Sequence, residues 1–295
     1  YMQVRFTDAH IELERAYAQI AGNGQVNMGL CCDFLAWRLS LYADVPTRGT
    51  LEARYAELLH YHDASWINIW TATSAYYHAL RGEPGQIPAI FSQHRLSDIN
   101  MLAPGRPMME MIENQVYLAE GAYAKLIARS AELLAVCEAM HYALVALHIR
   151  IQTAIAYEQL GKTEEAHACL ARALADAEPD GFVMPFVENF QLLRPMLSRE
   201  IVTPLIEQML ALGDAAIARH AAGRRPAVFE VLTEREFEIV ERMAERLSNR
   251  EIAAQLFLSE GSVKQYVNQI YAKLHIEGDT RTKRAQLAKL LGEKT

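Results

Sequence analysis

The sequence has few cysteines and no long apolar stretch. Four cysteines in 295 residues, at positions 31, 32, 137 and 169, do not form the disulfide framework of a secreted domain. No apolar run approaches the roughly 18 residues that cross a bilayer, and the run from Ala143 to Leu147 ends at His148. The N-terminal residues show no signal-peptide pattern. We therefore expect a cytoplasmic protein with no membrane association.

Catalytic and metal-binding patterns are also missing. No nucleophile, base and orienting acid can be assembled, so we expect no enzyme activity. Gly161-Lys162-Thr163 resembles the end of a phosphate loop, but the glycine required five residues earlier is Ala156. His60, His62 and Asp63 have no second ligand pair at useful spacing. The sequence thus predicts no metal site and no cofactor in this chain, and buried packing rather than redox chemistry for Cys31 and Cys32.

Alternating, strand-like patterns are nearly absent as well. Most segments have helical periodicity and are separated by Gly and Pro, which predicts an all-α protein of helices joined by short turns. The Gly-Arg-Arg-Pro stretch predicts a linker at residues 223–228. We therefore expect one domain at residues 1–222 and a second at 229–295.

A weak internal repeat indicates how the first domain is built. Ala154, Tyr157 and Gly161, followed by Leu170 and Ala173, occupy positions typical of a tetratricopeptide helix pair, in which small residues let two helices approach closely. We expect a tetratricopeptide-like helical-repeat region, and an irregular helical bundle over residues 7–200 is the alternative. Stacked repeats leave a concave surface that suits a ligand or a partner.

Charge is distributed unevenly along the chain. Residues 229–295 hold eleven basic and eleven acidic residues, so the formal net charge of −7 lies on residues 1–228. Residues 262–295 hold seven basic residues against three acidic ones. Because phosphate binding needs a local excess of Lys and Arg, we expect any contact with DNA in this last segment.

Helix-capping patterns define the second domain. Thr233 with Glu236, and Ser248 with Glu251, each form the pattern of a capping box, in which the two residues satisfy each other's free backbone amides. Ser259 is placed to cap a third helix that ends near His275. A short helix, a tight turn and a longer helix are therefore predicted here.

The third helix has one apolar and one polar face. Val263, Val267, Ile270 and Leu274 follow the spacing of a single buried stripe. The residues predicted to point outward are Lys264, Gln265, Asn268 and Gln269. A helix that exposes amides and a lysine after a tight turn has the geometry that enters a major groove.

These motifs resemble the LuxR-type helix-turn-helix family. The matching stretches are Leu-Thr-x-Arg-Glu at 232–236, Ser-Asn-Arg-Glu-Ile-Ala at 248–253 and Ser-x-x-Ser-Val-Lys-x-Tyr-x-x-x-Ile-x-x-Lys-Leu at 259–274. The resemblance implies a four-helix domain that binds double-stranded DNA. Tyr266 departs from the family's usual His, and an acidic turn follows Leu274.

The resemblance also implies residue roles. Base contacts are expected from Lys264, Gln265 and Asn268. Backbone contacts are expected from Ser259, Ser262, Gln269 and Lys273. In the family the last helix often pairs two modules; here we expect it at Lys283 to Leu291, in a homodimer or higher oligomer on DNA.

The end of the first domain resembles MalT-like regulators. The stretch from Ala173 to Phe186, followed by Leu192-Leu193, carries this resemblance. It implies a transcription activator with an ATPase domain upstream. This chain, which opens on Tyr1, would then be the C-terminal portion of a larger protein; a naturally short regulator is the alternative.

Trp66, Trp70 and Tyr77 repeat at helical spacing in the first domain. Such a stripe is typical of packing between repeats, but on a concave face it would suit a small ligand. Two hypotheses therefore remain for this domain. It senses a small inducer, or it is a scaffold that binds a regulatory protein.

Overall fold

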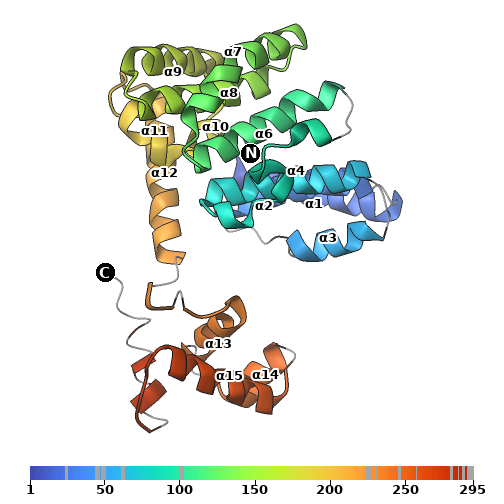
Figure 1. Cartoon of the computed structure of the whole chain (residues 1–295), viewed down its shortest axis with the longest axis vertical. Coiled ribbons are helices and arrows are strands. Elements are labelled where there is room, and N and C mark those ends of the chain that lie inside the picture. Colours follow the sequence, from blue (N-terminus) through green and yellow to red (C-terminus); the bar gives the residue numbers. More distant parts are fainter. Residues whose placement is uncertain are drawn as a thin grey trace. The chain divides into compact units, whose positions relative to one another are not determined.

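The computed structural model describes residues 1–23, 26–43, 47, 51–60, 64–99, 103–223, 227–229, 231–244, 247–256, 258–279, 282–284, 286–287 and 290. Every regular element in these ranges is helical, which confirms the all-α prediction. The chain divides into two compact units, Tyr1–Ala218 and Arg219–Thr295 (Figure 1). Of the predicted linker at 223–228, residues 224–226 lie outside the described residues. No helix in the described ranges is long and apolar enough to cross a membrane.

The first unit consists of α-helices and short 3₁₀ turns. Its helices are α1 (Phe6–Asn23), α2 (Val26–Ser40), α3 (Leu51–Leu59), α4 (Ala64–Arg81), α5 (Ala89–Ser92), α6 (Arg106–Ala119), α7 (Tyr123–Ala139), α8 (Ala143–Gln159), α9 (Thr163–Ala177), α10 (Met184–Val187), α11 (Phe190–Leu197) and most of α12 (Pro204–Gly223), which runs past the boundary at Ala218. Its 3₁₀ turns are η1 (Pro84–Gln86), η2 (Leu96–Asp98), η3 (Ala103–Gly105) and η4 (Glu178–Asp180).

The helices of the first unit pack mostly in chain order. Helix α1 packs on α2, while α4 contacts α2, α3 and α6. From α6 to α9 each helix packs on the next, α6 also contacts α8, and α10 packs on α8 and α11 (Figure 1). This is the stacked arrangement expected of helical repeats.

The turns between α6 and α10 repeat every twenty residues. The residues with left-handed backbone are Gly121 (φ 71°), His141 (φ 56°), Gly161 (φ 73°) and Gly181 (φ 62°). In each turn the following amide donates to the carbonyl five residues back, as in Tyr142 N to Cys137 O (2.8 Å) and Lys162 N to Tyr157 O (3.0 Å). This is the Schellman closure of a helix C-terminus. The sequence predicted the end at Gly161 but gave no sign that His141 would take the same place.

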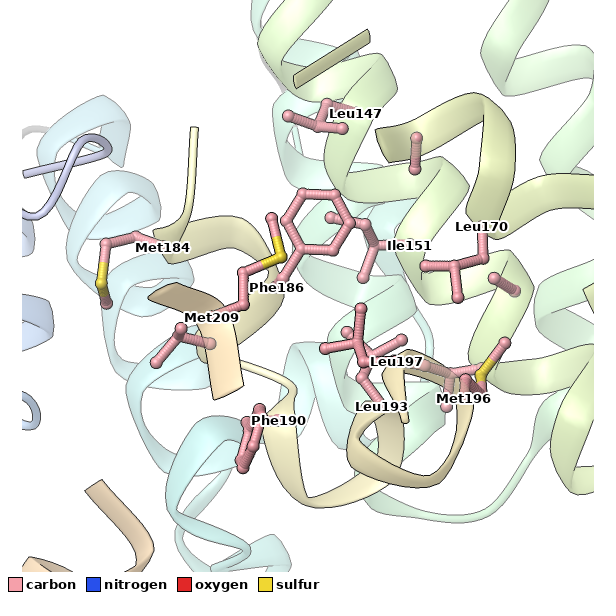
Figure 2. Close-up of a cluster of buried hydrophobic side chains, with 14 of the residues drawn as sticks. Leu147, Ile151, Leu170, Met184, Phe186, Phe190, Leu193, Met196, Leu197 and Met209 are labelled. Carbon is pink, nitrogen blue, oxygen red and sulfur yellow. The ribbon is translucent and has the colours of Figure 1, made fainter. Parts of the chain in front are cut away.

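Helices α8 to α12 enclose the largest apolar core of the first unit. Leu147 and Ile151 of α8 and Leu170 of α9 are buried there. The same core contains residues of α10, α11 and α12, which Figure 2 labels: Phe186, Phe190, Leu193, Met196, Leu197 and Met209. Helix α12 lies very close to α11 at Gly213. A Cβ added there would stand only 2.2 Å from the Phe190 ring.

A buried ion pair joins the two ends of the first unit. The guanidinium of Arg38 on α2 donates to both carboxylate oxygens of Glu188, at 2.7 and 2.9 Å. The hydroxyls of Tyr1 (2.6 Å) and Tyr76 (2.8 Å) donate to the same carboxylate. Burial acts to raise the pKa of Glu188, but the Arg38 charge and these hydrogen bonds outweigh it and hold the pKa below its usual value.

His148 lies beside this pair and is itself buried. Its ring meets Tyr76 edge to face at 6.5 Å, and its Nδ1 atom makes no hydrogen bond within the described part of the chain. Burial lowers the pKa of His148 from 6.5 to about 4, with Arg38 acting in the same direction and Glu188 against it. The imidazole is therefore neutral in the folded protein at neutral pH.

The left-handed turns predict opposite effects of two substitutions. Gly161→Ala should lower the free energy of unfolding by about 1 kcal/mol, because no neighbouring atom meets the new Cβ and the effect is one of backbone strain alone. His141→Gly should raise it by up to about 1 kcal/mol by relieving the same strain. Chemical denaturation measures both, and a loss of stability in His141→Gly would contradict the assignment.

The His148 site predicts acid sensitivity. A histidine whose folded pKa lies below its unfolded value stabilises the fold fully above about pH 6.5, and this contribution disappears as the pH falls towards 4. Across this window His148 accounts for a change of about 3 kcal/mol in the free energy of unfolding. His148→Leu should flatten the decline in unfolding free energy across this window. Parallel pH profiles for His148→Leu and the unmodified protein would refute this.

Candidate nucleic-acid interface

The second unit is built around three helices. They are α13 (Glu234–Ala244), α14 (Asn249–Gln255) and α15 (Glu260–Lys273), preceded by η5 (Ala227–Phe229) (Figure 1). Their inner faces meet in one core that contains Phe229, Ile239, Ile252, Val263 and Ile270. Helix α15 contacts both α13 and α14, so the core fixes which face of α15 points outward.

Reciprocal hydrogen bonds close the N-termini of α13 and α14. The amide of Thr233 donates to Glu236 Oε2 (2.7 Å), and the amide of Glu236 donates to Thr233 Oγ1 (3.3 Å). Ser248 and Glu251 form the same capping box, with distances of 2.7 and 3.3 Å. These bonds satisfy amides that would otherwise lack partners at a helix start.

Ser259 caps α15. Its Oγ accepts the amide of Ser262 at 3.0 Å, and the two hydroxyls lie 2.8 Å apart. The first turn of α15 is thereby fixed directly after the turn that follows α14. Both serines are expected backbone contacts, and they lie at the positive end of the helix dipole, where a phosphate is favoured.

The two faces of α15 differ as the pattern predicts. Val263, Val267 and Ile270 are buried in the core. Lys264, Gln265, Asn268 and Gln269 are all exposed. Tyr266, at the position where the family usually has His, is half-buried and packs against the core.

Lys273, another expected DNA contact, forms an ion pair with Glu236. Its Nζ lies 2.7 Å from Glu236 Oε2, and its side chain is 40% exposed whereas that of Glu236 is 4% exposed. Burial acts to raise the pKa of Glu236, but Lys273 and the hydrogen bonds from Thr233 outweigh it and lower this pKa. Glu236 therefore serves both as the cap of α13 and as an anchor for the end of α15.

Arg235 also anchors the motif, and sequence reasoning missed it. Its guanidinium donates to the Leu256 carbonyl at the end of α14 (2.6 Å) and pairs with Glu238 (2.6 Å). The first turn of α13 thus holds the turn before α15 through Arg235 and the end of α15 through Glu236. No local pattern announces a bond between residues 21 positions apart.

The segment after α15 folds back onto the core. Leu287 is buried, Lys283 lies over the Tyr271 ring at 5.5 Å, and Arg284 donates to the Leu247 carbonyl at 3.3 Å. Of the helix expected at Lys283 to Leu291, residues 283, 284, 286, 287 and 290 are helical and the others lie outside the described residues.

The candidate ligand residues of the first unit all lie on α4. Trp70 lines a cleft, whereas Trp66 and Tyr77 do not. Tyr77 accepts a hydrogen bond from Arg81 at 3.2 Å. His62 and Asp63 fall outside the described residues, and no group of three or more His, Cys, Asp or Glu in the described ranges could hold a metal ion.

The double role of Glu236 predicts its effect on stability. Glu236→Gln should lower the unfolding free energy of the second unit by about 1 to 2 kcal/mol, because it removes the charge that both the cap and Lys273 use. Glu238→Gln, which removes the exposed carboxylate two positions along α13 that pairs with Arg235, should change it by less than about 0.5 kcal/mol. Thermal and urea denaturation measure this difference, and equal effects of the two changes would rule it out.

Comparisons with known proteins agree with this geometry. Residues 230–285 match the family described as bacterial regulatory proteins, luxR family. The nitrate/nitrite response regulator protein NarP of Escherichia coli (strain K12) is 30% identical over 108 residues, which are 35% of this chain and 47% of NarP. The DNA-binding transcriptional activator DevR/DosR of Mycobacterium tuberculosis is 31% identical over 114 residues, 39% of this chain and 51% of that protein.

A third relative, the transcriptional regulatory protein LnrK of Bacillus subtilis (strain 168), is 42% identical over 50 residues, 17% of this chain and 23% of LnrK. The chain thus spans about half the length of NarP and DevR/DosR, and less of LnrK. No solved structure matches it significantly. Residues 230–285 are a helix-turn-helix domain of the LuxR family of bacterial regulatory proteins.

Proposed function

We propose that this chain is a bacterial transcription regulator that binds double-stranded DNA by placing α15 in the major groove. The observation that carries the proposal is the exposed row of Lys264, Gln265 and Asn268 on a helix whose opposite face is buried. Lysine donates to guanine edges, and amide side chains pair with adenine edges, so this row has the chemistry of base readout. The names of NarP, DevR/DosR and LnrK, all regulators, support the same function.

The flanking residues suit the phosphate backbone. Ser259 and Ser262 lie at the N-terminus of α15, and Gln269 directly follows Asn268, one turn after Gln265. Lys273 would contact a phosphate while it stays paired with Glu236, since 40% of its side chain is exposed. Because few cations are available, one module should bind weakly and with strong salt dependence, so we infer that two copies bind together as a homodimer.

For the first unit we propose a sensing role. A small inducer bound among its helices would favour one of two arrangements of the chain, and so change how the DNA-binding unit is used. Activation is favoured over repression because DevR/DosR is named an activator. A cytoplasmic location and an origin as the C-terminal portion of a larger MalT-like ATPase regulator belong to the same proposal. The alternative, a scaffold that recruits a regulatory protein, is favoured by the stacked helical hairpins.

The DNA proposal predicts the effect of Lys264→Ala. On a fragment selected by the full chain from a random DNA pool, the change should weaken binding by about 1 to 3 kcal/mol. It should have little effect on a scrambled fragment, because a base contact is specific to sequence. Lys125→Ala, which removes an exposed cation from the first unit, is the matched control.

Fluorescence anisotropy at several salt concentrations separates the outcomes. An equal loss on both fragments would assign Lys264 to the phosphate backbone instead of the bases. Unchanged binding of Lys264→Ala to the selected fragment would refute the placement of α15 in the groove.

A further inference from the structure

A cleft of about 600 Å³ opens on the first unit between α3, α4 and the segment from η1 to α5. This volume is in the usual range for a small-molecule site. The described residues that line it are Tyr55, Ala56, Leu59, Ile67, Asn68, Trp70, Thr71, Ser74, His78, Gln86, Pro88, Ala89 and Ile90. The α4 residues 67, 70, 71, 74 and 78 follow the spacing of one helix face, so a continuous side of α4 forms the wall.

Part of this wall is flat and held in place. The rings of Tyr55 and Trp70 stack with centroids 4.4 Å apart and planes at 26°. The indole Nε1 of Trp70 donates to the Leu51 carbonyl at 2.8 Å, which fixes the ring and uses its only donor. The pair therefore offers aromatic surface without a free hydrogen-bond donor on the indole, which suits a flat ring.

The remaining described lining mixes apolar and polar side chains and contains no Asp, Glu, Lys or Arg. Asn68, Ser74 and Gln86 supply amide and hydroxyl groups. His78 Nδ1 lies 2.9 Å from Glu83 Oε2, so the carboxylate orients the ring from outside the lining and leaves Nε2 for another partner. An ionised ligand would lose water here without meeting an opposite charge among the described lining residues, which is unfavourable. A neutral ligand that forms hydrogen bonds avoids this loss.

We propose that this cleft binds an uncharged small molecule with a flat ring system and an amide- or hydroxyl-type hydrogen-bonding group. The binding site stands on the geometry of the first unit alone; its use as an inducer site rests on the proposed regulatory function. It includes Trp70 of the expected ligand residues and does not use Trp66 or Tyr77.

Helix α4 connects the cleft to the buried ion pair. Tyr76 lies two positions after Ser74 and two before His78, which places it on the opposite side of α4 from the cleft. Its hydroxyl donates to Glu188, one of the two residues between α10 and α11. A ligand that shifts or rotates α4 would therefore act on the carboxylate that joins α2 to the end of the helical stack.

The probes for this proposal are two planar carboxamides, nicotinamide and 2-naphthamide, each compared with its carboxylate, nicotinate or 2-naphthoate. Saturation-transfer NMR and calorimetry on the full chain should show at least one carboxamide binding with a Kd about tenfold or more below that of its carboxylate. Ala56→Arg and Ala89→Arg, at exposed lining positions on two different elements, should each weaken that binding by about tenfold or more. Ala175→Arg, at an exposed position on α9, is the matched control and should leave it unchanged.

The proposal is overturned if neither carboxamide binds at millimolar concentration, if the carboxylates bind equally well, or if binding survives both arginine variants. Circular dichroism shows that each variant is folded before it is scored. These measurements contain no DNA, so they fail or succeed independently of the Lys264→Ala experiment. If neither carboxamide binds but DNA binding is normal, the cleft proposal is rejected and the proposed DNA-binding function stands.

Discussion

The first unit depends on one buried carboxylate. Glu188 accepts hydrogen bonds from Arg38, Tyr1 and Tyr76, so the N-terminal residues, α2 and α4 all converge on the short link between α10 and α11. A buried charge that loses its partner is strongly destabilising, typically by about 3 to 5 kcal/mol, whereas the intact pair adds little net stability. The pair therefore adds little to the free energy of unfolding. Instead it restricts which helices can pack together, because each buried charge needs the other. Any packing that separates α2 from the end of the stack leaves a charge unpaired.

The part of the fold that could be predicted from sequence is the part determined by local interactions. The capping boxes at Thr233 and Ser248 involve residues three positions apart, and the apolar stripe of α15 spans about three turns, so both can be recognised in the sequence. The end of α8 at Gly161 was equally clear, because glycine favours the left-handed backbone. His141 takes the same conformation against its preference, so no residue type announced it.

The interactions that sequence reasoning missed join distant residues. Arg38 and Glu188 are 150 positions apart, and Arg235 and Leu256 are 21 apart. Nothing local distinguishes these arginines from solvated ones; only packing makes them buried or half-buried. In the candidate interface, periodicity correctly placed Lys264, Gln265 and Asn268 on the exposed face. It could not show that Lys273, expected only to meet a phosphate, also fastens α15 to α13.

The identical turns at Gly121, His141, Gly161 and Gly181 have a consequence for how such a chain evolves. Because every helix in this stretch ends with the same hydrogen bond at the same interval, a hairpin of forty residues can be duplicated or deleted in one genetic event without creating a new kind of helix end. The apolar residues of α10 to α12 would then pack against whichever hairpin comes last. A family built this way would vary in length by whole hairpins, while insertions of a few residues would disrupt the stack.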